Sequence, residues 1–143
     1  MPRSKTIKVI IDTNLFISFL IGKRLIKLKQ LLVNSQIKLI FSEQNILELK
    51  LVTDRPKFRK YFNKNDVIDL IDLIYSIGKI TKVTRHPQIC RDPKDNYLLA
   101  LSDLGKADYL VSSDKDLLDI RQYKTTKIIS IDDLEKILIN ISP

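Results

Sequence analysis

Ile7-Lys8-Val9-Ile10-Ile11-Asp12 is a short β-branched run that ends at an acid, and the residues after it suit a helix that breaks at Gly22. β-Branched side chains favour strands, and a short run that is almost continuously apolar is typical of a strand buried on both faces. The start of the chain therefore predicts a buried strand that leads into a helix.

The same order of strand and helix recurs along the rest of the chain. Further strands are predicted at Ile37–Phe41, Ile80–Val83, Tyr109–Ser112 and Lys127–Ser130. Helices are predicted from Ser42 to before Pro56, from Asn63 to Gly78, from Asp92 to Gly105, from Asp114 to Asp119 and from Asp132 to Ile139. Strands that alternate with helices predict an α/β fold with a parallel sheet covered on both faces.

Size and composition predict one domain with a charged surface. The 143 residues, 44% of them hydrophobic, fit a single domain over 1–143 that can bury a real core. The formal net charge of +8 favours a polyanionic partner such as RNA, DNA or an anionic surface. A lysine-rich composition that serves only solubility would give the same charge, so charge alone does not decide the function.

Cysteine content and hydropathy indicate the compartment. Cys90 is the only cysteine, which excludes an intramolecular disulfide and multi-cysteine metal sites and favours a reducing cytoplasm. The longest apolar stretch, Leu15–Ile21, is far shorter than the roughly 20 residues of a membrane helix. We expect a soluble cytoplasmic protein without a membrane partner.

Acidic residues are placed where a parallel sheet has its working edge. Ligands of such sheets bind beyond the carboxyl ends of the strands, where Asp12 and Asp114 follow predicted strands. Asp95 lies in the first turn of the helix that Asp92 begins, and Glu48 would reach the same edge from its helix. Carboxylates gathered there would repel one another strongly, so the pattern predicts a divalent cation.

Each acid also has a purely structural explanation. Asp92 before Pro93 is a common helix cap, and Asp95 suits the positive end of the same helix. Asp116 fits a solvated helix surface and is a lesser site candidate. Asp12 is harder to explain structurally, because an acid directly after a buried strand is costly without a partner.

Several other chemistries are disfavoured by absent residues. His86 is the only histidine, which disfavours a histidine-pair ribonuclease or a histidine-rich zinc site, and the three glycines are too far apart for a phosphate loop. Hard oxygen ligands remain, and these suit Mg²⁺ or Mn²⁺.

Four motifs in order resemble a PIN domain over nearly the whole chain, from about Lys8 to Leu138. They are Asp12-Thr13-Asn14, Glu48 before Arg55-Pro56-Lys57-Phe58, Arg91-Asp92-Pro93-Lys94-Asp95-Asn96, and Ala107–Leu118 with Val111-Ser112-Ser113-Asp114 at its centre. The likeness is greatest to the single-domain prokaryotic branch described as toxins of toxin–antitoxin pairs. Ser113 departs from the pattern, since glycine is frequent at this position in the family.

The resemblance implies a Rossmann-like, PIN-type sandwich with a central five-stranded, mostly parallel sheet flanked by helices. It further implies a metal-dependent endoribonuclease that uses Mg²⁺ or Mn²⁺. By motif position, the catalytic and metal-binding residues would be Asp12, Glu48, Asp95 and Asp114, with Asn14, Ser112 and Asp116 in support. RNA would be the substrate, and an antitoxin protein a partner.

Further expectations concern partners. Arg85 and Arg91 flank the acidic helix start and are predicted to contact RNA. The apolar residues between Leu15 and Val33 could form a homodimer or antitoxin surface, and burial in the monomer core explains them equally well. One rival function is an inactive PIN-like module that binds RNA or a partner. A phosphotransfer enzyme is disfavoured, because Asn14 stands where the phosphatase version needs a second aspartate.

Overall fold

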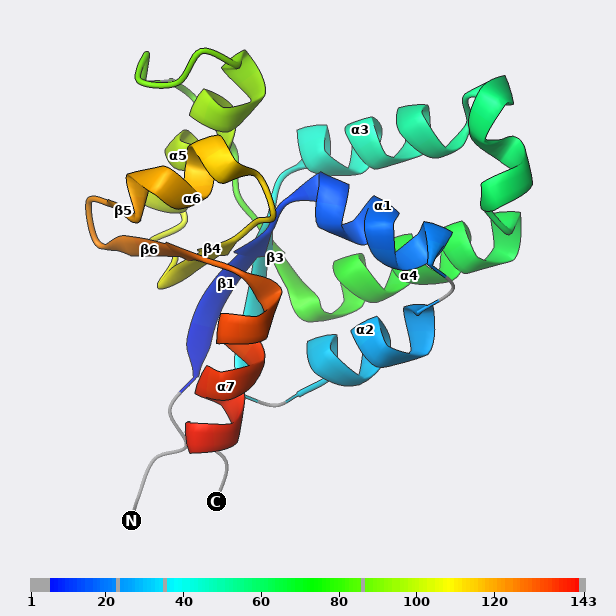
Figure 1. The fold of residues 1–143 in the computed structure, drawn as a ribbon, viewed down its shortest axis with the longest axis horizontal. Helices are drawn as coiled ribbons and strands as arrows, with labels where there is room; N and C mark the ends of the chain where they lie inside the picture. The colour runs from blue at the N-terminus through cyan, green and yellow to red at the C-terminus, as the bar shows by residue number, and fades with distance from the viewer. Residues whose placement is uncertain (1–5, 23, 35, 86, 142–143) are drawn as a thin grey trace.

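A computed structural model describes residues 6–22, 24–34, 36–85 and 87–141. A central sheet runs through the molecule with helices packed on both sides (Figure 1). The strands are β1 (Ile7–Ile11), β2 (Ile37–Phe41), β3 (Gly78–Ile80), β4 (Tyr109–Val111), β5 (Gln122–Tyr123) and β6 (Thr126–Ile129). The helices are α1 (Thr13–Ile21), α2 (Leu25–Leu32), α3 (Glu43–Thr53), the 3-10 helix η1 (Pro56–Tyr61), α4 (Lys64–Ile77), α5 (Pro93–Leu104), α6 (Lys115–Ile120) and α7 (Ile131–Ile141).

The sheet has the predicted architecture with one more strand than expected. Its order is β3-β2-β1-β4-β6-β5, with every pair parallel except β5 and β6. The prediction of an α/β fold with a mostly parallel sheet is confirmed, but the sheet has six strands, not five. Most predicted elements agree with the observed bounds within about two residues.

The predicted strand Ile80–Val83 begins two residues later than the observed strand β3, Gly78–Ile80. The strand begins at Gly78, directly after α4, with extended backbone angles of φ −95° and ψ 164°. A Cβ atom at this position would lie 2.6 Å from the Phe41 ring, so only glycine allows the chain to pass this close to β2. Gly78 was expected only to end a helix, but it also forms the first residue of β3.

The short strand β5 was not predicted. It pairs antiparallel with β6, with Tyr123 opposite Thr126, through a turn in which Lys124 has a φ of 51°. Glycine or asparagine is the usual signal for such a backbone conformation, and this turn has neither. Arg121, before the strand, also has a positive φ of 66°.

Two hydrophobic cores lie on the two faces of the sheet. Val9 and Ile11 of β1 face the core that packs against α1, α2, α3, α4 and α7, whereas Ile10 faces the core under α5 and α6. Alternate side chains of a strand point to opposite faces, so burial of all three explains why the run has no polar alternation. This double burial fixes the carboxyl end of β1 in the middle of the sheet.

The apolar residues of the first two helices belong largely to the monomer core. The buried members are Leu15, Phe16, Phe19, Leu20, Leu28 and Leu32. Ile26 and Val33 are exposed at 74% and 59%. Within the described ranges, no helix combines the length and the apolar character that a membrane span needs.

Candidate functional site

The site is built at the carboxyl ends of the two central strands. β1 and β4 are neighbours, with Ile11 opposite Val111, and the Asp12 amide donates to the Val111 carbonyl at 2.9 Å. Asp12 and Ser112 are therefore the first residues beyond adjacent strand ends. This is the edge at which parallel sheets of this kind bind ligands.

Asp12 is a buried carboxylate held at both oxygens. Its exposed fraction is 7%. One oxygen accepts from the Asn14 amide at 3.2 Å, which caps α1, and the other accepts from the Ser112 hydroxyl at 2.9 Å. The predicted supports Asn14 and Ser112 are thus in direct contact with Asp12, Asn14 through its backbone.

Ser112 also connects Asp12 to the second acid of the strand edge. Its fully buried hydroxyl accepts a hydrogen bond from the Asp114 amide at 3.0 Å. Asp114 in turn caps α6 by accepting from the Asp116 amide at 2.9 Å. One hydroxyl therefore fixes the relative positions of two carboxylates.

Asp95 joins this group from the first turn of α5. It is only 5% exposed, and its carboxylate accepts no hydrogen bond from any residue that the structure describes. Asp95, Asp114 and Asp116 each offer a carboxylate oxygen, and these oxygens all lie within 4.8 Å of one another. Oxygen donors of this kind suit a hard divalent cation.

Burial and mutual repulsion change the protonation of these acids. Burial, followed by the charge of Asp114, raises the pKa of Asp95 to about 6 from an ordinary 3.8. Burial also raises the pKa of Asp12, although the Ser112 hydrogen bond and the charge of Lys94 oppose the rise. A bound cation would relieve both penalties, so the donor set fits a divalent metal.

Glu48 reaches the same pocket from α3. The four predicted acids, Asp12, Glu48, Asp95 and Asp114, line one pocket together with Asp92 and Asn14. Glu48 is half-buried, and its Oε1 lies 3.4 Å from the Lys94 Nζ. The orientation of Glu48, which the sequence left open, is therefore toward the acids.

Sequence reasoning missed several residues of this pocket. Lys94, Asn45 and Tyr97 also line it. The Ser42 side chain and Asn45 form a capping box at the start of α3, and the Ser42 hydroxyl contacts the Tyr97 hydroxyl. The spacing of Ser42 and Asn45 is a cap signal in the sequence, whereas the contact with Tyr97 joins distant segments and has none.

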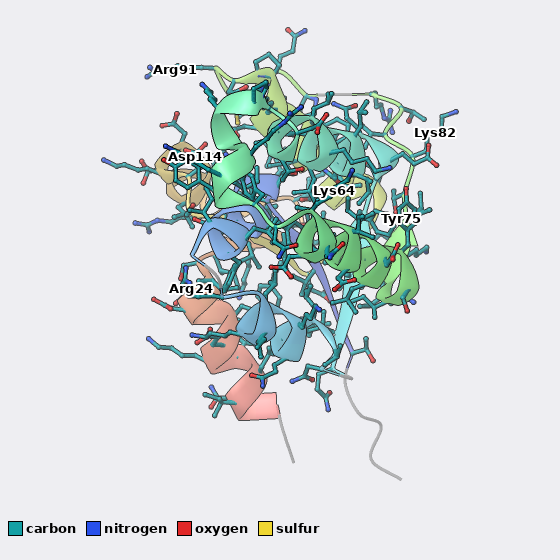
Figure 2. The ribbon with its side chains drawn as sticks, turned by 90° about the vertical axis from the view of Figure 1, so that its right-hand side faces the viewer. Arg24, Lys64, Tyr75, Lys82, Arg91 and Asp114 are labelled. Carbon is teal, nitrogen blue, oxygen red and sulfur yellow. The ribbon has the colours of Figure 1, made fainter. Side chains whose placement is uncertain are left out.

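The two arginines predicted to contact RNA lie on the surface. Arg91 is exposed, and Figure 2 shows it at the outer edge of the molecule. The segment before it is anchored by Asn96, whose side-chain oxygen accepts from the Ile89 and Cys90 amides at 3.0 and 2.8 Å. Arg85 is exposed too, but its charge acts on Lys124, which pairs with Asp103 in the last turn of α5. Arg85 thus lies toward the end of α5 opposite to the acids, and His86 lies outside the described residues.

Comparison with known proteins agrees with this geometry. The model of the PIN domain family matches residues 8–116, which include every acidic residue that lines the pocket. An uncharacterized protein of Methanocaldococcus jannaschii is 33% identical over 118 residues, which cover 80% of this chain and 76% of that protein. No solved structure matches the chain. The match over most of the chain, with its acids gathered at one strand edge, shows that this chain belongs to the PIN domain family.

Proposed function

We propose that the chain is a metal-dependent endoribonuclease that hydrolyses RNA phosphodiesters in the acidic pocket. The observation that carries the proposal is the meeting of Asp12, Glu48, Asp95 and Asp114 in one pocket at the carboxyl ends of β1 and β4. PIN domains are generally nucleases that use divalent metals, which supports the class of reaction. RNA as the substrate and the roles of individual residues are the finer parts of the proposal.

The metal would be held by Asp95 and Asp114, with Asp12 and Glu48 completing the site. Asp116 offers a carboxylate oxygen within 4.8 Å of those of Asp95 and Asp114, so we assign it a larger part than the sequence suggested. When bound, Mg²⁺ or Mn²⁺ would supply the positive charge that activates water and stabilises the leaving oxygen.

The chain itself contributes orientation. Ser112 and the capped helix starts hold Asp12 and Asp114 in fixed positions, so little reorganisation is needed when substrate arrives. Asn14 and Ser112 act as positioning residues through their hydrogen bonds to Asp12. Exposed Arg91 is proposed to contact the RNA backbone outside the pocket.

The direct test is incubation of a mixed single-stranded RNA pool with and without Mn²⁺. We expect cleavage that requires the metal and that falls by at least about 100-fold in Asp12→Asn. Asp119→Asn, which removes an exposed acid of α6, is the matched control and should cleave normally. A wild-type protein that binds the RNA without metal-dependent cleavage would instead support the inactive binding module.

We also propose that the protein acts as the toxin of a toxin–antitoxin pair, with an antitoxin protein as partner. α3 leaves Leu47 and Leu51 exposed at 56% and 59%, and both line a groove that Glu48 and Lys94 join to the acidic pocket. An apolar segment bound there would cover the pocket. Co-expression with the product of a neighbouring short reading frame should yield a stable complex that lacks nuclease activity.

A further inference from the structure

Lys94 is the only cationic side chain among the described residues that line the acidic pocket. It stands in the first turn of α5, between the acids Asp92 and Asp95. Its Nζ lies 3.4 Å from the Glu48 Oε1, and its positive charge opposes the rise in the pKa of Asp12 that burial causes. In the protein without metal, Lys94 therefore supplies part of the positive charge that these carboxylates need.

The ion pair between Lys94 and Glu48 is weak. The Lys94 side chain is 64% exposed, and ion pairs with one exposed partner at this distance contribute little to stability. A lysine carries its charge on a flexible stem, so the ammonium can move several ångströms while the helix stays in place.

A groove beside the acidic pocket offers space into which Lys94 can move. Lys94 and Glu48 line both the acidic pocket and the groove along α3, which also contains Leu47, Leu51 and Arg55. A divalent cation among the acids would repel the ammonium toward this groove. There the ammonium would still lie next to the acidic pocket, in a position to attract an anionic substrate.

We propose that Lys94 is an exchangeable counterion, which compensates the acids while the metal is absent and binds a substrate phosphate once the metal is present. The compensating role of Lys94 rests on the geometry of the pocket. The binding of a substrate phosphate rests in addition on the proposed nuclease function. The proposal assigns to one residue two effects of opposite sign. Lys94 weakens metal binding and strengthens RNA binding.

The test compares Lys94→Met, Lys94→Arg and Lys136→Met with the wild type. Lys136 is an exposed lysine of α7 that lines neither the acidic pocket nor the groove along α3, so its replacement removes the same charge elsewhere on the surface. Mn²⁺ affinity is measured by calorimetry without RNA. Binding of a labelled single-stranded RNA is measured by anisotropy in Ca²⁺ over a range of salt concentrations, with gels to verify that the RNA stays intact.

We expect Lys94→Met to bind Mn²⁺ about three- to tenfold more tightly, because a competing positive charge is gone. The same variant should bind RNA roughly fivefold more weakly, with a salt dependence smaller by about 0.7 in the logarithmic slope, as for one lost contact to single-stranded phosphate. Lys94→Arg should resemble the wild type in both measurements, and Lys136→Met should change neither.

Two results would overturn the inference. One is unchanged or weaker Mn²⁺ binding in Lys94→Met, which would show that the lysine does not compete with the metal. The other is an equal loss of RNA binding in Lys94→Met and Lys136→Met, which would reveal an effect of net charge. Absence of RNA cleavage by the wild type would instead refute the proposed nuclease function, while the calorimetry would still decide whether Lys94 competes with the metal.

Discussion

At the scale of single residues, Asp95 carries the most unfavourable charge of the pocket. Its pKa is about 6 in the folded protein and near 3.8 in the unfolded chain, so folding favours its protonated form. The resulting penalty is absent below about pH 4, grows as the pH rises and is complete above about pH 6. In metal-free buffer, Asp95→Asn should raise the free energy of unfolding by about 1 to 3 kcal/mol at pH 7.5 and hardly change it at pH 4.

Urea denaturation at the two pH values measures this difference. Asp119→Asn, at an exposed position, should show no gain at either pH. A stability gain of Asp95→Asn that is equal at both pH values would contradict the assignment of the penalty to the charge.

Ser112 is the residue on which the geometry of two acids depends. Ser112→Ala removes the hydroxyl donor of Asp12, in a buried hydrogen bond, and the acceptor of the Asp114 amide, in a part-buried one. We expect a loss of about 1 to 3 kcal/mol in stability, and a weaker Mn²⁺ affinity because Asp12 loses a group that lowers its pKa. Denaturation and calorimetry measure the two effects. Ser113→Ala, at the exposed neighbour, should leave both unchanged.

The same residues show how far sequence reasoning extends. Asp12 and Asp114 could be placed because Asp12 directly follows a strand and Asp114 comes three residues after another, and strand ends meet at one edge of a parallel sheet. The 3.4 Å contact between Lys94 and Glu48 could not, because it depends on the angle between α3 and α5 and on side-chain rotamers. From the sequence alone, Lys94 between Asp92 and Asp95 resembles an ordinary solvated lysine, because nothing in the sequence shows that its helix lies beside Glu48.

At the scale of elements, the segment before α5 is organised by one side chain. The Asn96 oxygen accepts from the Ile89 and Cys90 amides, and its nitrogen donates to the Cys90 carbonyl at 3.1 Å. Asn96→Ala would leave these backbone groups to find water, which predicts a loss of about 1 to 3 kcal/mol.

Hydrogen exchange gives the element-scale measurement. The Ile89 and Cys90 amides should lose protection in Asn96→Ala, while the amides of β1 and β4 keep theirs. Asn65→Ala, at an exposed position of α4, is the control. Uniform loss of protection across the sheet would show that Asn96 stabilises the whole fold and not this segment.

The bounds of strands β3 and β5 could not be predicted from the sequence. Strong periodic signals located the helices, but β3 and β5 are set by tertiary contacts. β3 begins at Gly78 because the chain passes against Phe41, and β5 exists because Lys124 adopts a positive φ beside the already formed β6. Neither contact leaves a local pattern of alternating hydrophobic residues, so neither strand bound could be inferred.

At the scale of the whole molecule, the acidic pocket couples folding to metal binding. A ligand that binds only the folded state stabilises it by about 2.7 kcal/mol at 100 times its dissociation constant. Protons compete with the metal for Asp95, whose pKa of about 6 lies between two accessible pH values. Stabilisation by Mn²⁺ should therefore be small at pH 5 and clearly larger at pH 7.5.

Thermal denaturation at both pH values, with ionic strength matched by KCl, measures this coupling. Asp12→Asn should lose most of the stabilisation, whereas Asp119→Asn should retain it, because Asp12 lines the pocket and Asp119 does not. Equal stabilisation by Mn²⁺ and by KCl would show only general screening of charge. Equal stabilisation by Mn²⁺ at both pH values would show that the metal binds without displacing a proton from Asp95, and Asp95 would then not be one of the groups that hold it.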